Sequence, residues 1–215
     1  MKGPIQIGPG QAGPFETPTT HYDCSYDDRK RWVSYWYQIR EIISRKPDSV
    51  LEIGPGNKTV SNYLNHKGCK VTTVDIDPGV KPAVVANVTR LPFKNDVFDT
   101  VACYEVLEHL EFNQFINGLR EMEMVSKDAV IISLPDAGGT WNWKIPLFGW
   151  IIIPKIREKK PEHQFDGEHY WEINKKGYPL DKIKKKIIQT GLELENDYLI
   201  PEWTYHRIFT LTVSH

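Results

Sequence analysis

The sequence is poor in sulfur-containing residues, with three cysteines and three methionines among 215 residues. Cys24, Cys69 and Cys103 are odd in number, and no two have the CxxC spacing of a metal or redox pair. Unpaired thiols are typical of a reducing compartment, so we expect free cysteines and a cytoplasmic protein. The opening residues, MKGPIQIGPG, also lack the apolar stretch of a secretory signal.

The chain has no excess of either charge and no long apolar run. Its formal net charge is -1, so we expect no nucleic-acid partner, which would require a basic surface. No apolar stretch is long enough to cross a bilayer as a helix. Hydrophobic residues make up 40% and charged residues 26%, which predicts a globular protein with a full core.

Short β-type runs alternate with helical patterns through most of the chain. The expected strands are residues 49–53, 70–75, 83–86, 98–103, 129–134, 192–199 and 206–213. This alternation predicts an α/β fold with a doubly wound, mostly parallel seven-stranded sheet that helices cover on both faces. A helix at 180–190, ending at Gly191, precedes the last two strands, which should close the sheet as an antiparallel hairpin.

A further helix is expected ahead of the first strand. Ser25 and Asp28 form a capping-box pattern, so this helix should begin after Ser25. Its apolar residues recur at helical spacing, at Trp32, Val33, Trp36, Ile39, Ile42 and Ile43.

The strongest local signal is the run VLEIGPG at residues 50–56. Glycines directly after a strand allow the backbone to approach a ligand closely. A P-loop is excluded because Asn57 precedes Lys58, and a dinucleotide fingerprint lacks its third glycine because Thr59 stands there. Glu52 suits a ligand with an ammonium group, since a carboxylate pairs with it. The alternative is a tight turn that binds nothing.

An acid at the end of the second expected strand supports a nucleoside ligand. Asp75 follows the glycines by roughly 20 residues, where a carboxylate accepts hydrogen bonds from ribose hydroxyls. Asp77 stands just before Pro78 and is better explained as a turn or cap residue.

Three further runs complete an ordered set: NVTRLPF at 87–93, FDTV at 98–101 and YEVLEHL at 104–110. Over residues 48–135 the chain therefore resembles class I S-adenosylmethionine-dependent methyltransferases of the type 11 family, which have a Rossmann-like fold. The resemblance implies that Glu52, Gly54 and Gly56 contact the methionine part of S-adenosylmethionine. It also implies that Asp75 binds the ribose and that Ile76 lines the adenine pocket.

The remaining cofactor positions also follow from this resemblance. Asn87 stands where the family usually has an aspartate that contacts the adenine amino group, and an amide oxygen can still accept that bond. Val88 would offer its backbone amide to the ring. Cys103 and Tyr104, at the end of the fourth strand, would lie near the methionine and the sulfonium. Ligands of open α/β sheets bind at these strand ends.

Glu105, Glu108 and His109 also invite a metal interpretation, as in RNA 2′-O-methyltransferases that carry a metal. A metal site needs further ligands of defined geometry, which His163 or His169 would have to supply. The alternative is an ordinary family motif with a structural His109. We expect no metal.

The stretch 136–177 interrupts the alternation and is long for a connection, which predicts a functional insert. Its aromatic part, residues 141–155, is interpreted as a lid over the acceptor pocket, a dimer contact or a peripheral membrane contact. In the loop that follows, His169 or His163 is a candidate general base for an acceptor hydroxyl or amine, with Glu172 orienting it. A structural loop histidine is the alternative.

The N-terminal residues His21–Asp23, Tyr26, Arg29 and Trp32 are predicted to fold over the cofactor. Aromatic faces attract a sulfonium cation, and Arg29 could meet the methionine carboxylate. A packing helix without ligand contacts is the alternative.

Together these features predict a methyltransferase that acts on the oxygen or nitrogen of a small-molecule or cell-surface-precursor acceptor. An RNA-directed methyltransferase and a catalytically silent cofactor-binding protein are the alternatives, and the oligomeric state is left open. The expected organisation is an N-terminal segment and cap helix (1–47), a cofactor-binding core (48–135), an insert forming a lid or acceptor site (136–177), and a C-terminal helix with closing strands (178–215).

Overall fold

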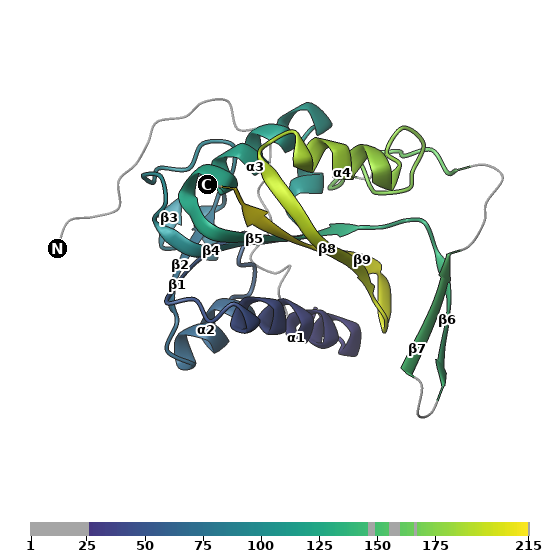
Figure 1. The fold of residues 1–215 in the computed structure, drawn as a ribbon, viewed down its shortest axis with the longest axis horizontal. Helices are drawn as coiled ribbons and strands as arrows, with labels where there is room; N and C mark the ends of the chain where they lie inside the picture. Colours follow the sequence, from purple (N-terminus) through teal and green to yellow (C-terminus); the bar gives the residue numbers. More distant parts are fainter. Residues whose placement is uncertain (1–25, 146–148, 155–159, 166, 215) are drawn as a thin grey trace.

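A seven-stranded sheet forms the centre of the fold (Figure 1). The computed structural model describes residues 26–145, 149–154, 160–165 and 167–214. The strand order is β3-β2-β1-β4-β5-β9-β8. The strands are β1 (Ser49–Ile53), β2 (Lys70–Asp75), β3 (Val84–Val85), β4 (Phe98–Tyr104), β5 (Ser126–Pro135), β8 (Leu192–Ile200) and β9 (Trp203–Val213).

The pairing of the strands confirms the predicted fold class. Strands β1 to β5 pair in parallel, while β9 pairs antiparallel with both β5 and β8. The C-terminal hairpin is therefore an edge of the sheet, with its last strand on the inside. The central strands carry apolar residues on both faces because helices cover both.

Helices pack on the two faces of the sheet in separate pairs (Figure 1). On one face lie α1 (Arg29–Ser44) and α2 (Thr59–His66), and on the other lie α3 (Phe112–Val125) and α4 (Leu180–Ile188). Two short 3-10 turns, η2 (Pro78–Val80) and η3 (Leu107–His109), follow β2 and β4. Each face has its own buried apolar cluster, centred on Leu119 under α3 and on Ile42 under α1.

The start and the buried face of α1 differ from the prediction. The helix begins at Arg29, and the Asp28 side chain caps it by accepting a hydrogen bond of 2.8 Å from the backbone N–H of Arg31. The predicted start after Ser25 is therefore wrong, since Asp28 itself is the capping residue. Trp32 and Trp36 are 55% and 56% exposed, because the helix buries the face that carries Ser34, Tyr35, Gln38 and Ile42.

The insert contains a hairpin that the sequence analysis did not predict. Strands β6 (Thr140–Ile145) and β7 (Gly149–Pro154) pair antiparallel and stand away from the main sheet (Figure 1). At its base, the hydroxyls of Thr140 and Thr204 are hydrogen-bonded at 2.7 Å. Ile151 and Ile153 are 40% and 46% exposed, so this hairpin has an apolar surface. Its role as a lid, dimer contact or membrane contact stays a prediction.

None of the helices in the described part of the chain has the length and apolar character needed to cross a membrane.

The end of the insert returns to the core through Trp171. This side chain is fully buried, with ring centroids of Phe112 and Phe115 each 5.0 Å away. Its indole N–H donates a hydrogen bond of 3.1 Å to the backbone carbonyl of Leu110. The contact fixes residues 169–173 against the turn that follows β4, and it therefore holds the insert at the carboxyl end of the sheet.

Replacing Trp171 with alanine should lower the free energy of unfolding by about 3–5 kcal/mol, because it leaves a cavity among packed aromatic rings. Urea denaturation measures this loss. Trp32→Ala, at a half-exposed tryptophan, is the matched control and should change stability by about 0.5 kcal/mol or less. Equal losses in the two variants would contradict this role of Trp171.

Candidate functional site

The carboxyl ends of β1, β2 and β4 meet at one edge of the sheet. In the pairing register, Ile53 lies opposite Val74 of β2 and opposite Cys103 of β4. The residues that follow these strands are therefore neighbours in space although they are up to 50 positions apart in sequence. This edge is where open α/β sheets bind ligands.

A glycine turn leaves β1 at this edge. Gly54 has a φ of +69°, and its backbone N–H donates a hydrogen bond of 2.8 Å to the carbonyl of Val74. A Cβ at Gly54 would overlap Cγ2 of Val106, so the position excludes any side chain. Gly56 has a φ of +50°. The turn thus exposes backbone rather than side chains to the space above the sheet.

Glu52 is buried just before this turn. Its side chain is 3% exposed, and Oε2 has no hydrogen-bond partner among the described residues. Burial raises the pKa of Glu52 to about 8, although Ser61 at the start of α2 opposes the shift. A buried carboxylate without a partner is costly, and a cationic group brought against it would relieve that cost.

The polar side chains after β2 and β3 are partly engaged within the chain. One oxygen of Asp75 accepts a hydrogen bond of 2.9 Å from the Asp77 N–H, and burial raises the pKa of Asp75. Asp77 accepts from the Gly79 N–H at 2.7 Å and caps η2, which confirms its predicted turn role. The side-chain oxygen of Asn87 accepts from both the N–H and the hydroxyl of Thr89, each at 2.9 Å. These two bonds use both lone pairs of the Asn87 oxygen, so the predicted hydrogen bond from an adenine amino group to this oxygen is not favoured. The hydrogens on Nδ2 are not used by these two bonds.

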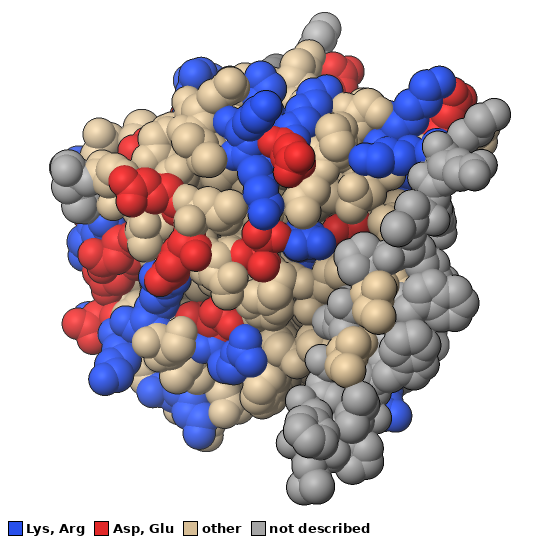
Figure 2. Space-filling model, turned by 45° about the vertical axis from the view of Figure 1, so that its right-hand side comes forward, with Lys and Arg blue, Asp and Glu red and all other residues tan. Residues whose placement is uncertain are grey.

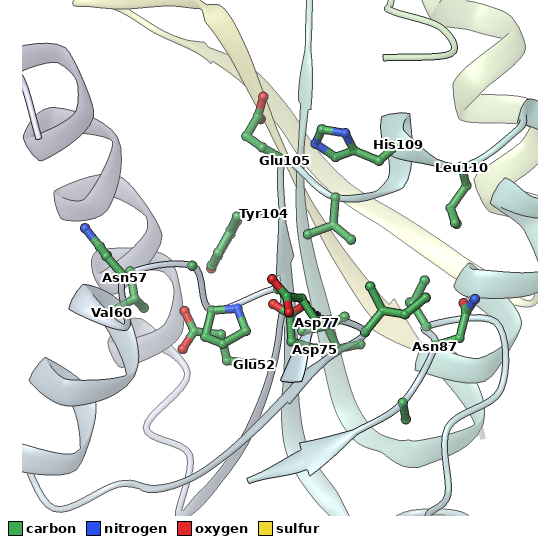
Figure 3. A pocket seen from close by; sticks show the side chains of 18 of the residues that line it. Glu52, Asn57, Val60, Asp75, Asp77, Asn87, Tyr104, Glu105, His109 and Leu110 are labelled. Carbon is green, nitrogen blue, oxygen red and sulfur yellow. Dashed lines mark hydrogen bonds between the residues drawn. The ribbon is translucent and has the colours of Figure 1, made fainter. Parts of the chain in front are cut away.

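A cavity of about 480 Å³ lies above these strand ends. Figure 3 shows Glu105 and His109 on one side of this cavity, apart from Glu52, Asp75 and Asn87. The predicted cofactor residues on its wall are Glu52, Gly54, Gly56, Asp75, Ile76, Asn87, Val88 and Tyr104. Its volume falls in the range of small-molecule binding sites.

Cys103 is the exception among the predicted cofactor residues. Its side chain is fully buried in the core under α3 and is not part of the cavity wall. Burial raises the pKa of this thiol well above its usual value, so it stays neutral. Alternation along β4 explains the difference, because Cys103 and Tyr104 point to opposite faces of the sheet.

The start of α1 contributes residues that sequence reasoning missed or misplaced. Arg31 lines the cavity with a buried Nε that has no hydrogen-bond partner in the described chain, whereas the predicted Arg29 is exposed. The guanidinium of Arg31 stacks over the ring of Tyr26 at 4.2 Å. Arg29 and Arg31 are two positions apart, about half a helical turn, so they face different sides of α1, and the sequence pattern did not show which of them faces the cavity. His21–Asp23 lie outside the described residues.

A hydrogen-bond network ties α1 to the glycine turn. Asn57, directly after the turn, donates through Nδ2 to Asp27 Oδ1 at 2.9 Å, and the Tyr35 hydroxyl donates to the same oxygen at 2.9 Å. This network fixes the position of the helix that carries Arg31 relative to the backbone of Gly54–Gly56. Asn57 lies 22 positions from Tyr35 and 30 positions from Asp27, so no local sequence motif predicts this network.

The far side of the cavity carries Glu105 in an unusual backbone conformation. Glu105 has a φ of +52°, and Oε1 is buried without a hydrogen-bond partner in the described chain. Oε2 lies 3.5 Å from Nε2 of His206, a buried histidine of β9. Burial raises the pKa of Glu105 to about 7 and lowers that of His206 to about 3. A non-glycine residue held in the left-handed region is a frequent feature of functional sites.

The three predicted catalytic residues lie behind this wall instead of on it. His169 Nδ1 is 3.5 Å from Glu172 Oε1, so the predicted pair is formed, yet neither residue lines the cavity. His163 Nε2 lies 2.7 Å from the backbone carbonyl of His169 and supports the loop. Their role as a general base therefore stays a prediction that the cavity geometry does not favour.

The family described as the methyltransferase domain matches residues 51–132 of this chain. That range spans the glycine turn, the acid after β2 and the strand end at Tyr104, all of which face the cavity. By this match, residues 51–132 are similar to a methyltransferase domain.

Solved structures of methyltransferases share the fold of this chain. The 1,6-didemethyltoxoflavin-N1-methyltransferase of Burkholderia thailandensis superposes with a TM-score of 0.65 at 14% identity, covering 97% of this chain and 94% of that chain. The magnesium protoporphyrin IX methyltransferase of Synechocystis PCC 6803 gives 0.62 at 14% identity, covering 93% and 92%. A methyltransferase from Clostridium acetobutylicum ATCC 824 gives 0.60 at 13% identity, covering 89% and 94%. No curated protein matches the chain by sequence.

Replacing Gly54 with alanine should weaken binding of S-adenosylhomocysteine by about tenfold or more, because the new Cβ displaces Val106 and the turn. Isothermal calorimetry measures the change. Gly68→Ala is the matched control: Gly68 has a φ of +96° and nothing within 4 Å of its would-be Cβ. Both variants should lose roughly 1–2 kcal/mol of stability from the positive φ, but only Gly54→Ala should lose affinity.

The double variant Gly54→Ala, Val106→Ala should regain much of the affinity, since it removes the overlap. Unchanged binding in Gly54→Ala would show that the ligand does not approach this turn.

Proposed function

We propose that this methyltransferase transfers the methyl group of S-adenosylmethionine to an oxygen or nitrogen of a small-molecule or cell-surface-precursor acceptor. The observation that carries the proposal is the single cavity that joins the glycine turn to a second wall at Glu105, His109 and Tyr170. One wall suits the cofactor, and the other leaves room for an acceptor beside it. Among the structural neighbours, the Burkholderia enzyme was crystallised with 1,6-didemethyltoxoflavin, a small molecule, which favours this acceptor class.

The cofactor's amino-acid end is assigned to Glu52, Arg31 and the glycine turn. Glu52 lines the cavity and has an unpartnered oxygen, so it suits an ammonium group, while Arg31 suits a carboxylate. Because Gly54 and Gly56 have no side chains, the turn leaves space for the cofactor between Glu52 and Arg31. The opposite charges of Glu52 and Arg31 would orient the amino-acid group of the cofactor before any reaction.

The adenosine end is assigned to residues after β2 and β3. Asp75 has one oxygen engaged by Asp77 and a second one for ribose hydroxyls. Ile76, which is 38% exposed, and the buried Val88 provide apolar contacts for the ring. Asn87 would donate from Nδ2 to a ring nitrogen, since Thr89 engages its oxygen.

The chain's contribution to the reaction is alignment and exclusion of water. Bound S-adenosylmethionine supplies an electrophilic methyl carbon, and transfer requires the acceptor atom in line with the bond that breaks. Tyr104, whose hydroxyl donates to the Gln38 carbonyl at 3.2 Å, is held rigidly between α1 and the cavity. Its position supports a role in fixing the methyl donor relative to the acceptor wall.

The affinity for S-adenosylhomocysteine should rise with pH, by up to about tenfold per unit from about pH 6 to about pH 7.5. The pKa of Glu52 is raised to about 8, so the free enzyme holds this carboxyl protonated at neutral pH. An ammonium group requires the ionised form, and binding therefore releases a proton below the raised pKa. Calorimetry in buffers of different ionisation enthalpy measures both quantities.

Glu52→Gln keeps the shape of the side chain but removes the charge. This variant should bind about tenfold or more weakly at the upper end of the range, since a charge-assisted hydrogen bond contributes about 1.5–3 kcal/mol. It should also lose the proton release. A wild-type affinity that is flat with pH would remove Glu52 from the ammonium site.

The proposed acceptor class is tested by supplying S-adenosylmethionine with a labelled methyl group together with a cell metabolite extract and, separately, total RNA. We expect a labelled small molecule that gains the mass of one methyl group, detected by mass spectrometry, and no label in RNA. Figure 2 shows acidic and basic side chains interspersed on the face drawn, in agreement with this expectation.

Label recovered in RNA would instead establish the RNA-directed alternative. Tight binding of S-adenosylhomocysteine with no label in either pool would establish a catalytically silent cofactor-binding protein.

A further inference from the structure

Two histidines and a carboxylate gather at the acceptor wall, where His109 lines the cavity and the other two residues lie behind it. Glu108 and His109 belong to the short turn η3, and His169 comes from the insert, 60 positions later. One ligand atom from each of these residues lies within 4.8 Å of the other two. The ring centroids of the two histidines are 5.0 Å apart, in an edge-to-face arrangement.

Glu108 is the least expected member of this group. Its side chain is fully buried, and both carboxylate oxygens lack a hydrogen-bond partner in the described chain. His169 Nε2 lies 4.0 Å from Oε1, which is beyond hydrogen-bonding distance. An isolated buried carboxylate is among the most costly groups in a protein interior, and buried charges are normally paired or coordinate metals.

Each histidine has one ring nitrogen held by an oxygen atom. His109 Nδ1 lies 3.0 Å from the backbone carbonyl of Glu168, which can only accept, so Nδ1 carries the proton. His169 Nδ1 faces Glu172 Oε1 at 3.5 Å. In the neutral form of each ring the proton is then on Nδ1, and the lone pair that can bind a metal is on Nε2. Such an outer oxygen, which fixes the tautomer and the orientation of the ring, is typical of metal-binding histidines.

We propose that Glu108, His109 and His169 bind a divalent transition-metal ion at the acceptor side of the cofactor cavity. Two imidazole nitrogens and one carboxylate oxygen suit ions such as Zn²⁺, Co²⁺ or Mn²⁺ rather than the oxygen-only sites of Ca²⁺. The sequence analysis expected no metal because the further ligands were undefined, and the structure supplies His169.

The spacing of the ligand atoms fits a common centre with a small contraction. Bonds of about 2.0–2.2 Å from metal to nitrogen or oxygen place any two ligand atoms at most about 4.4 Å apart. With all separations within 4.8 Å, the ligand atoms therefore need to approach one another by at most about half an ångström. His169 is on the insert, whose attachment through Trp171 keeps its backbone close to η3.

Three protein ligands leave coordination positions for another molecule. His109 lines the cavity together with Glu105 and Tyr170, so the ion would lie at the wall where the acceptor is placed. An acceptor oxygen bound there would lose its proton to water more readily and would then attack the methyl carbon. The oxygen–carbon bond forms as the sulfur–carbon bond breaks, giving S-adenosylhomocysteine. The role of the metal in methyl transfer rests on the proposed function, and it narrows the acceptor to a molecule whose reacting oxygen binds the metal ion.

The test is titration of Co²⁺ into the full-length, chelator-treated protein, followed by visible absorption and thermal unfolding. We expect one equivalent to bind, with absorption bands of nitrogen-ligated Co²⁺ and a higher Tm. Absence of saturable binding of Co²⁺, Zn²⁺ and Mn²⁺ would overturn the proposal. These readouts do not depend on methyl transfer, so the metal site and the proposed function can fail separately.

Glu108→Gln is the decisive variant. It should reduce Co²⁺ affinity by at least about tenfold, yet its metal-free form should be at least as stable as the wild type, because an unpaired buried carboxylate has been neutralised. The stability measurement shows whether the variant is still folded, so a loss of Co²⁺ affinity cannot be mistaken for a loss of folding. His66→Asn, at an exposed histidine of α2, is the control and should bind Co²⁺ normally. Wild-type affinity in Glu108→Gln would overturn the site.

Acetohydroxamate, a small oxygen chelator, tests the open positions. If the ion faces the cavity, adding this chelator to the Co²⁺ protein should change the absorption bands without removing the metal. Unchanged bands would overturn the role in acceptor binding.

Discussion

Two carboxylates buried at the carboxyl end of the sheet set the chemistry of this protein. Glu52 and Glu108 each have an oxygen with no hydrogen-bond partner in the described chain, and both are almost completely shielded from water. Desolvation raises the pKa of both groups, and the hydrogen bonds that favour the ionised form, from Ser61 in the case of Glu52, offset this shift only in part. Such groups are costly to keep, and a cationic ligand removes the cost. We connect the first to the ammonium group of S-adenosylmethionine and the second to a metal ion.

The parallel sheet brings Glu52 and the segment that carries Glu108 to the same edge. Strands β1 and β4 are adjacent, so the residues that follow Ile53 and Tyr104 leave the sheet at the same edge. The turn at Gly54 then keeps side chains away from the space above the strands. As a result, one wall of the cavity is formed by residues at the ends of β1 and β2, which we assign to the cofactor, and the other by the segment after β4, which we assign to the acceptor.

The insert determines the composition of the acceptor wall. Trp171 anchors its end against Phe115 of α3, and this contact brings Tyr170 to the cavity and His169 to η3. The aromatic stretch of the sequence correctly marked this region as unusual. The sequence analysis did not predict the hairpin, although residues 140–145 alternate between polar and apolar side chains, because residues 149–154 are apolar at nearly every position and show no alternation.

The sequence by itself determined the seven strands of the main sheet, the helices between them, the glycine turn and the acid at the end of β2. Each of these depends on local patterns: apolar periodicity, glycine after a strand, or an acid at a strand end. Tertiary structure alone decided which side chains share a wall. It replaced Arg29 by Arg31, withdrew Cys103 into the core, and joined His169 to Glu108. The reason is physical, since helix rotation, strand face and long-range packing are set by contacts between segments that no local pattern contains.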